Sequence, residues 1–200
     1  MTWGQKPNTI EYWRGRLPHW EVSDGLYFIT IHLAGIIPRD AARRIREMSQ
    51  KLKDSPIDRR ESLQKKVFGE MERWLDRSGD TQYLANPEVA TAVTEAIHYR
   101  IKQGIWTVFE HVILPTHLHL LLEFGSLGMW RSLTGFKRRT GYLAARILRL
   151  EKRSFWQKEW FDHWVRTPEE AAAIAEYIRQ NPVKAGLVSD YHDWPYGSWR

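Results

Sequence analysis

The chain has 200 residues, of which 42% are hydrophobic and 27% charged, so it can form one globular domain with a sizeable core. It has no cysteine, which excludes disulfides and thiolate metal sites. No apolar run approaches the ~20 residues that cross a bilayer, and the N-terminal stretch lacks the apolar core of a signal peptide. We therefore expect a cytoplasmic protein that has no membrane partner.

The charge and the aromatic content favour a nucleic-acid partner. The net charge is +6, from 30 Lys and Arg against 24 Asp and Glu, and the chain has eleven tryptophans. Cations neutralise phosphates and flat rings stack on bases, so this composition suits a single strand of nucleic acid. Charge alone is a weak signal, because many basic proteins bind nothing negative.

The first quarter of the chain predicts an arm, a strand and a helix. Residues 1–23 are polar and broken by prolines and a glycine, which favours an N-terminal arm. Residues 25–34 alternate and are rich in aromatic and β-branched side chains, which predicts a strand with His32 on an exposed or edge face. Pro38 then stands where a helix would start, and the apolar residues that follow have helical spacing.

Two more helices are predicted before the centre of the chain. Residues 54–80 are strongly charged around an apolar helical stripe, so we interpret their charges as a solvated face. Asn86 and Pro87 form a typical helix opening, with an N-cap followed by proline in the first turn. That helix is predicted to run to Gly104.

The central stretch, residues 105–124, has two apolar runs that flank a Pro-Thr break, which predicts two strands joined by a tight connection. The second run begins with His117 and His119. Alternate residues of a strand share one face, so the two imidazoles would lie side by side, where they can grip one divalent metal ion. The alternative is that both histidines are satisfied core residues.

A basic segment follows. A helix is predicted to begin near Met129, and residues 137–153 carry seven positive charges and one negative beside an apolar stripe. Residues 155–167 are dense in Trp and Phe without clear periodicity and predict a strand or an extended strap. For DNA binding we select six cations: Lys137, Arg138, Arg139, Arg146, Arg149 and Lys184.

The last helix is predicted to start at Thr167, an N-cap followed by proline and two acids. It should run to Asn181, where Pro182 would end or kink it. Tyr177 and Asn181 lie four residues apart and so share a face of this helix. From spacing alone, Tyr177 also fits an ordinary core tyrosine.

These segments, taken together, resemble the REP-associated tyrosine transposases, the single-tyrosine branch of the HUH endonuclease superfamily. The similarity spans roughly residues 16–196. It rests on PTHLHLLLE, the basic helix, FWQKEWFDHWVR and YIRQNPVKAGLV, with RLPHW and GLYFITIHLAGIIP at the front. Thr116 departs from the pattern, since relatives often have Asn before the first histidine. We expect the change to be tolerated, because that residue shapes the turn and is not a ligand.

The resemblance implies a ferredoxin-like α+β fold of the HUH endonuclease type, with a central antiparallel sheet flanked by helices. It also implies Mg²⁺ or Mn²⁺ bound by His117, His119 and a third ligand one helical turn after the tyrosine, which is Asn181. Tyr177 would be the nucleophile. We divide the chain into an N-terminal arm (1–23), one HUH transposase domain (24–188) and a C-terminal tail (189–200).

The function implied is a metal-dependent endonuclease and transposase that cleaves and rejoins single-stranded or hairpin DNA, including REP-like sequences, through a 5′-phosphotyrosine intermediate. It would act as a monomer or homodimer in the cytoplasm, at the nucleoid. Three alternatives stay open: a metal-dependent phosphohydrolase that uses water as nucleophile, a non-catalytic protein that binds DNA hairpins, and a metal-free structural protein. Detection of a covalent adduct between protein and DNA would distinguish the tyrosine transposase from all three alternatives.

Overall fold

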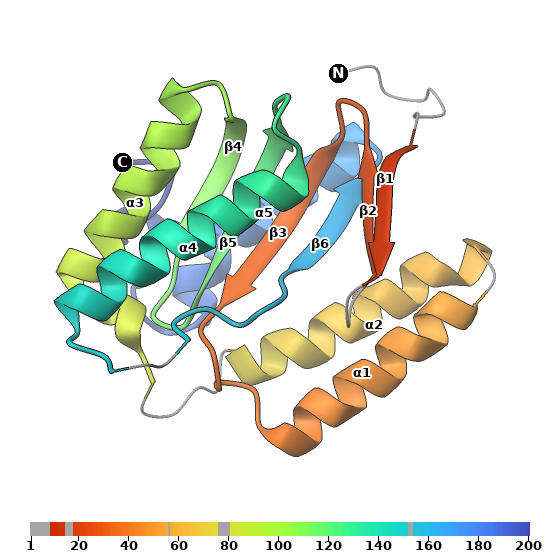
Figure 1. Cartoon of the computed structure of the whole chain (residues 1–200), viewed down its shortest axis with the longest axis horizontal. Coiled ribbons are helices and arrows are strands. Elements are labelled where there is room, and N and C mark those ends of the chain that lie inside the picture. The colour runs from red at the N-terminus through yellow and green to blue at the C-terminus, as the bar shows by residue number, and fades with distance from the viewer. Residues whose placement is uncertain (1–8, 15–17, 56, 76–80, 152–153) are drawn as a thin grey trace.

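A four-stranded antiparallel sheet forms the centre of the molecule (Figure 1). The structure is a computed structural model, and it describes residues 9–14, 18–55, 57–75, 81–151 and 154–200. The strands lie in the order β4-β5-β3-β6. Their bounds are β3 Leu26–His32, β4 Trp106–Ile113, β5 His117–Phe124 and β6 Phe161–Val165.

Helices connect these strands as a ferredoxin-like βαββαβ core. Helix α3 leads into β4, the tight turn at Pro115 joins β4 to β5, and α4 links β5 to β6. Two further helices, α1 and α2, lie between β3 and α3 in the chain, and α5 follows β6. The bounds are α1 Arg39–Asp54, α2 Ile57–Leu75, α3 Pro87–Lys102, α4 Met129–Ile147 and α5 Pro168–Lys184. The predicted α+β fold is therefore confirmed.

Each face of the sheet packs against its own set of helices, because alternate strand residues point to opposite sides. One face packs against α3 and α4 through a core that includes Ile29, Ile31, Leu120, Val93 and Phe136. The other face packs against α1, α2 and α5 through a core that includes Phe28, Leu121, Val67, Met71 and Ile178. In the register of β3 with β5, His119 lies opposite Thr30 and His117 opposite His32. The histidines thus lie on the face that α1, α2 and α5 cover.

The two predicted helix starts are confirmed by their caps. The Asn86 side chain accepts hydrogen bonds from the backbone N–H groups of Glu88 and Val89, at 2.9 and 3.2 Å. The Thr167 side chain accepts one from the N–H of Glu170, at 3.2 Å. Both caps satisfy donors that the first helical turn leaves without a partner.

Helix α5 ends later than predicted. It continues through Pro182 to Lys184, and its end is set by Gly186, whose φ of +68° is left-handed. The N–H of Gly186 bonds to the carbonyl of Val183 and the N–H of Leu187 to that of Pro182, at 3.0 and 2.9 Å. This is a glycine-terminated helix end, in which two carbonyls of the last turn gain a donor. The glycine terminates the helix and the proline does not.

The prediction that His32 lies on an exposed or edge face was wrong. The side chain is buried, with 6% of its surface exposed, and its Nδ1 lies 2.9 Å from the carbonyl oxygen of Leu33. The reason is that His32 pairs with His117 of β5 on one side, while on the other side the N–H of Gln157, in the segment before β6, bonds to the His32 carbonyl. Burial lowers the pKa of His32 to about 4, so the ring is neutral at neutral pH.

The basic segment is only partly helical. Helix α4 ends at Ile147, and Arg149 follows it with a φ of +52°. Lys152 and Arg153, which belong to the predicted basic segment, lie outside the described residues. The cations that the helix itself presents are therefore those between Arg131 and Arg146.

The segments predicted as arm and tail both contact the sheet domain. Strands β1 (Thr9–Arg14) and β2 (Pro18–Val22) form a separate antiparallel pair, and the Glu21 carboxylate accepts a hydrogen bond of 2.7 Å from the N–H of Met129, the first residue of α4. Near the other end, Tyr196 and Ser198 bond to the backbone of β4 at Ile113 and His111. Among the described residues, no helix is long and apolar enough to span a membrane.

Candidate active site

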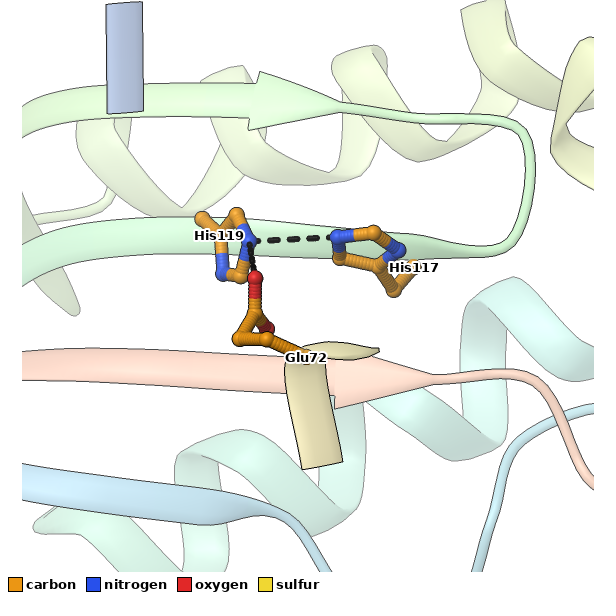
Figure 2. A group of neighbouring side chains, drawn as sticks. All are labelled: Glu72, His117 and His119. Atoms are coloured by element: carbon orange, nitrogen blue, oxygen red, sulfur yellow. Dashed lines mark hydrogen bonds and ion pairs between the residues drawn. The ribbon is translucent and has the colours of Figure 1, made fainter. Parts of the chain in front are cut away.

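Two imidazoles meet at the start of β5. The Nε2 atoms of His117 and His119 lie 3.1 Å apart, and both side chains are buried, with 2% and 0% of their surface exposed (Figure 2). Both come from one strand and lie two residues apart, so the backbone itself holds the rings side by side. Burial, and then the neighbouring His119, lower the pKa of His117 to about 3. His117 is therefore a neutral ring.

Two threonine hydroxyls orient these rings through contacts with their Nδ1 atoms. The Thr116 Oγ1 lies 2.8 Å from Nδ1 of His117, and the Thr30 Oγ1 lies 2.9 Å from Nδ1 of His119. The Thr116 hydroxyl also donates to the carbonyl oxygen of Leu75, at 3.2 Å. A hydroxyl has one proton to give, so Thr116 must accept from Nδ1–H of His117. This fixes the tautomer of His117 and leaves the Nε2 lone pair directed into the site.

A carboxylate from α2 completes the group. The Oε2 atom of Glu72 lies 3.5 Å from Nε2 of His119, and Glu72, His117 and His119 each offer a ligand atom within 4.8 Å of the others (Figure 2). The second oxygen, Oε1, is buried and has no hydrogen-bond partner in the described part of the chain. Burial raises the pKa of Glu72, but the charge and hydrogen bonding of His119, with His117 and Tyr177, outweigh it and lower the pKa to about 2.

This donor set fits a divalent metal ion. Bonds of about 2.1 Å at right angles place neighbouring ligand atoms about 3.0 Å apart, close to the 3.1 Å between the two Nε2 atoms. The unpartnered Oε1 of Glu72 needs a cation or a donor, since an unpaired buried carboxylate oxygen is costly. An imidazole binds a metal ion in its neutral form, so two such ligands and one carboxylate would leave a divalent ion with a net positive charge.

Tyr177 projects from α5 into this group. Its hydroxyl donates a hydrogen bond to Oε2 of Glu72, and its ring lies 5.6 Å from that of His119. Phe28 and Phe68 each contact it at 5.9 Å, edge to face. The Tyr177 side chain is half-buried, so it extends from the buried group of Glu72, His117 and His119 to the protein surface. The predicted tyrosine and the predicted histidines are thus brought together, joined through a carboxylate.

Asn181 lies one turn beyond Tyr177 on α5 and is buried, with 3% of its surface exposed. It stays the predicted third ligand, and Glu72 is a second candidate for the same position. Sequence reasoning missed Glu72 because the charges of residues 54–80 were interpreted as a solvated face. A signal was available, since Glu72 follows Phe68 by four residues and so lies on the apolar side of that helix.

The six cations predicted to bind DNA occupy two separate places. Lys184 is exposed, and its Nζ lies 4.7 Å above the Tyr177 ring. The others belong to α4 or follow it, across the sheet from the tyrosine. Four of these are exposed: Arg138, Arg139, Arg146 and Arg149. Lys137 is half-buried, donates to the carbonyl of Lys158 and lies over the Trp160 ring, and burial lowers its pKa to about 8.

Comparison with known proteins finds REP-associated tyrosine transposases among the sequence relatives and among the structures of similar fold. No protein-family model matches the chain. A candidate REP-associated tyrosine transposase of Haemophilus influenzae is 31% identical over 102 residues, which cover 44% of this chain and 55% of that protein. A REP-associated tyrosine transposase of Escherichia coli is 27% identical over 96 residues, 44% of this chain and 51% of that protein. The match thus spans about half the length of these curated relatives.

A solved structure shares the fold over nearly the whole chain. It is a REP-associated tyrosine transposase bound to a REP hairpin, with a TM-score of 0.53 and 18% identity, and the match covers 94% of this chain and 82% of that one. The resemblance to the REP-associated tyrosine transposases is confirmed. At this identity the structural match concerns the fold, and the residues of the site rest on the geometry above.

The first prediction decides between the two candidates for the third ligand. Glu72→Gln should weaken Mn²⁺ binding at least about tenfold, because it removes the negative charge from the ligand set. Asn181→Ala should be milder, because water can replace a neutral amide. The measurement is Mn²⁺ affinity by titration, with Glu176→Gln, an exposed acid on α5, as control. A larger loss from Asn181→Ala than from Glu72→Gln would make Asn181 the ligand.

The second prediction concerns the orientation of His117. Thr116→Val keeps the shape of the side chain but removes the acceptor for Nδ1–H, so Mn²⁺ affinity should fall roughly tenfold. Thr94→Val is the control, because the Thr94 hydroxyl donates to the carbonyl of Ala90 within its own helix, α3. Thermal unfolding is measured in parallel. If stability falls while Mn²⁺ affinity is unchanged, Thr116 ties the turn to α2 and does not orient the ligand.

Proposed function

We propose that this protein is a metal-dependent tyrosine transposase, which cleaves single-stranded or hairpin DNA and rejoins it through a 5′-phosphotyrosine intermediate. The observation that carries the proposal is the hydrogen bond from the Tyr177 hydroxyl to Glu72, whose carboxylate also faces His119. The proposed nucleophile, a carboxylate that accepts its hydrogen bond and two imidazoles suited to a metal ion lie in continuous contact. A purely structural tyrosine would not need this arrangement.

Tyr177 would attack the phosphorus of the scissile phosphate. The phenolic oxygen forms the new bond to phosphorus, the bond from phosphorus to the 3′-oxygen breaks, and that oxygen takes up a proton to become a free 3′-hydroxyl. An unassisted phenol with a pKa near 10 is only ~0.1% ionised at pH 7, a cost of roughly 4 kcal/mol. Glu72 would hold the hydroxyl in position through the hydrogen bond that it already accepts, the phenolic proton would pass to water, and the positive charges of Lys184 and of a bound ion would stabilise the phenolate. Attack by a 3′-hydroxyl on the phosphotyrosine reverses the step and rejoins strands.

His117, His119 and a third ligand, Glu72 or Asn181, would hold Mg²⁺ or Mn²⁺. The ion, when bound, polarises the phosphate and stabilises charge on its oxygens. The protein contributes orientation, because Thr116 and Thr30 fix the rings whose Nε2 atoms face the site. Lys184, close above the Tyr177 ring, provides a positive charge beside the developing phenolate.

The DNA partner is proposed from the charge of the protein and from its relatives. The structural neighbour was solved with a REP hairpin, and the exposed arginines of α4 suit the phosphates of such a hairpin. We expect the protein to work as a monomer or homodimer in the cytoplasm, at the nucleoid, where its DNA would lie. The basic surface of α4 would hold DNA while Tyr177 acts on a strand across the sheet.

The third prediction tests the nucleophile. Tyr177→Phe should keep the fold and the DNA affinity but abolish the covalent adduct, because it removes only the attacking oxygen. The assay incubates the protein with single-stranded DNA from the flanks of its own gene and scores a shifted band that resists denaturation. EDTA should prevent the adduct in the unmutated protein, and Mg²⁺ or Mn²⁺ should restore it.

Tyr142→Phe is the matched control, since Tyr142 is exposed on α4 and lies beside Arg146. This variant should form the adduct at an unchanged rate. An adduct of full yield in Tyr177→Phe would move the nucleophile elsewhere, with Tyr142 the next to examine. Cleavage without an adduct in the unmutated protein would indicate that water is the nucleophile and that the protein is a phosphohydrolase.

The fourth prediction concerns the basic surface of α4. Replacing Arg138 and Arg139 together by Gln should weaken binding to many DNA sequences and flatten its salt dependence, because each lost phosphate contact removes ~0.7 from the log–log slope on single strands. Discrimination between hairpins should change less, since phosphate contacts carry no sequence information. The measurement is a salt titration of affinity on a cognate and a scrambled hairpin. An unchanged slope with loss of the cognate complex alone would show that these arginines read bases.

A further inference from the structure

A groove of about 610 Å³ opens beside Tyr177, between α2 and α5 and above strands β3 and β6. Its volume lies in the range of pockets that bind small organic molecules, roughly 300–1,000 Å³. Tyr177 forms part of its wall, so anything bound in the groove touches the proposed nucleophile. The groove is separate from the group of Glu72, His117 and His119, because none of these three residues lines it.

Aromatic rings form the floor and one side of the groove. Phe28 and Phe161 belong to the sheet and are buried, while Phe68 projects from α2 and is half-buried. The ring of Phe68 lies 5.0 Å from that of Phe161 and 5.2 Å from that of Phe28. The two buried rings hold the Phe68 ring in place, so a flat ligand can stack on the part of Phe68 that stays exposed.

The polar groups of the groove are mixed in sign. Lys65 and Arg166 supply two cations, and Glu169 and Glu170 supply two acids. The Glu170 carboxylate already has hydrogen-bond partners, because it accepts from His163 and from the N–H of Arg166, at 2.8 and 2.9 Å. A balanced set of donors and acceptors around aromatic walls suits a nucleobase, whose edges carry both. A run of phosphates would instead require a positive surface.

We propose that this groove binds the base of the nucleotide on the 3′ side of the scissile phosphate, stacked on Phe68. The proposal rests on the proposed function. In an in-line displacement, the attacking and leaving oxygens lie on opposite sides of phosphorus. The nucleoside that leaves with its 3′-hydroxyl therefore departs away from Tyr177. The nucleotide that stays bonded to the tyrosine is the one on the 3′ side, and the groove lies on the side of Tyr177.

The groove therefore has two consequences for the reaction. It holds the base before attack, which positions the phosphate against the tyrosine oxygen. It also holds the same base after cleavage, which keeps the covalent intermediate in place until a 3′-hydroxyl rejoins it. A strand that lacks this one base should react slowly even when every other nucleotide is present.

The test compares strands with and without that base. Sizing the fragment released from an unmodified strand locates the scissile phosphate, and a second strand then carries an abasic site on its 3′ side. Base stacking on an aromatic ring is lost on abasic substitution, so the rate of adduct formation should fall roughly tenfold. Tyr177→Phe protein, which binds without reacting, should show a similar loss of affinity for the abasic strand.

Variants of Phe68 assign the effect to the groove. Phe68→Leu should slow the reaction of the intact strand and should remove most of the difference in rate between the intact and abasic strands. Phe68→Trp should retain the advantage of the base, because the ring is kept. Phe109→Leu is the control, since Phe109 is half exposed on β4, the edge strand farthest from β6 and the groove.

The outcomes separate the two proposals. Equal rates for the intact and abasic strands in the unmutated protein would overturn the groove assignment and leave the tyrosine mechanism standing. A base effect that persists at full size in Phe68→Leu would also overturn it, because another surface would then hold the base. No adduct with any strand would overturn both. The comparison of strands needs no variant, so it decides the matter even if Phe68→Leu folds poorly.

Discussion

The site depends on one buried carboxylate. Glu72 reaches from α2 to the face of the sheet, receives the Tyr177 hydroxyl from α5 and faces His119 on β5. A buried carboxylate is costly unless it is paired and hydrogen-bonded, so these three elements must pack together for any of them to be satisfied. The two imidazoles and the proposed nucleophile are therefore held together by α2, which lies between β3 and α3 in the chain.

The sheet separates the proposed catalytic residues from the basic helix. The face covered by α1, α2 and α5 carries the histidines, the tyrosine and the aromatic groove, while α4 presents its exposed arginines on the other side. Under the proposed function, a DNA strand that reaches both places would pass around the domain. Substitutions in α4 would then alter DNA affinity and leave the group around Tyr177 unchanged.

Local patterns predicted much of this structure. Alternation placed both histidines on one face of a strand, and Asn86 and Thr167 marked helix starts, because caps and pleats depend on neighbouring residues alone. Contacts between distant segments could not be predicted in this way. Glu72 meets His119 across 47 positions of sequence, and the burial of His32 depends on the distant segment before β6, in which the N–H of Gln157 bonds to the His32 carbonyl. Helix α5 continues through Pro182 to Lys184, and the left-handed Gly186 just beyond it ends the helix.

The backbone of Tyr196 and Ser198 occupies the outer side of β4 at His111 and Ile113. Without it, an outermost strand would present free N–H and carbonyl groups, which another chain can use to extend the sheet. Residues 196–198 thus cover the open edge of β4 at its last residues, where another chain could otherwise pair. The covered stretch leads directly into the turn before His117, so the same contacts hold one side of the turn from which the histidines emerge.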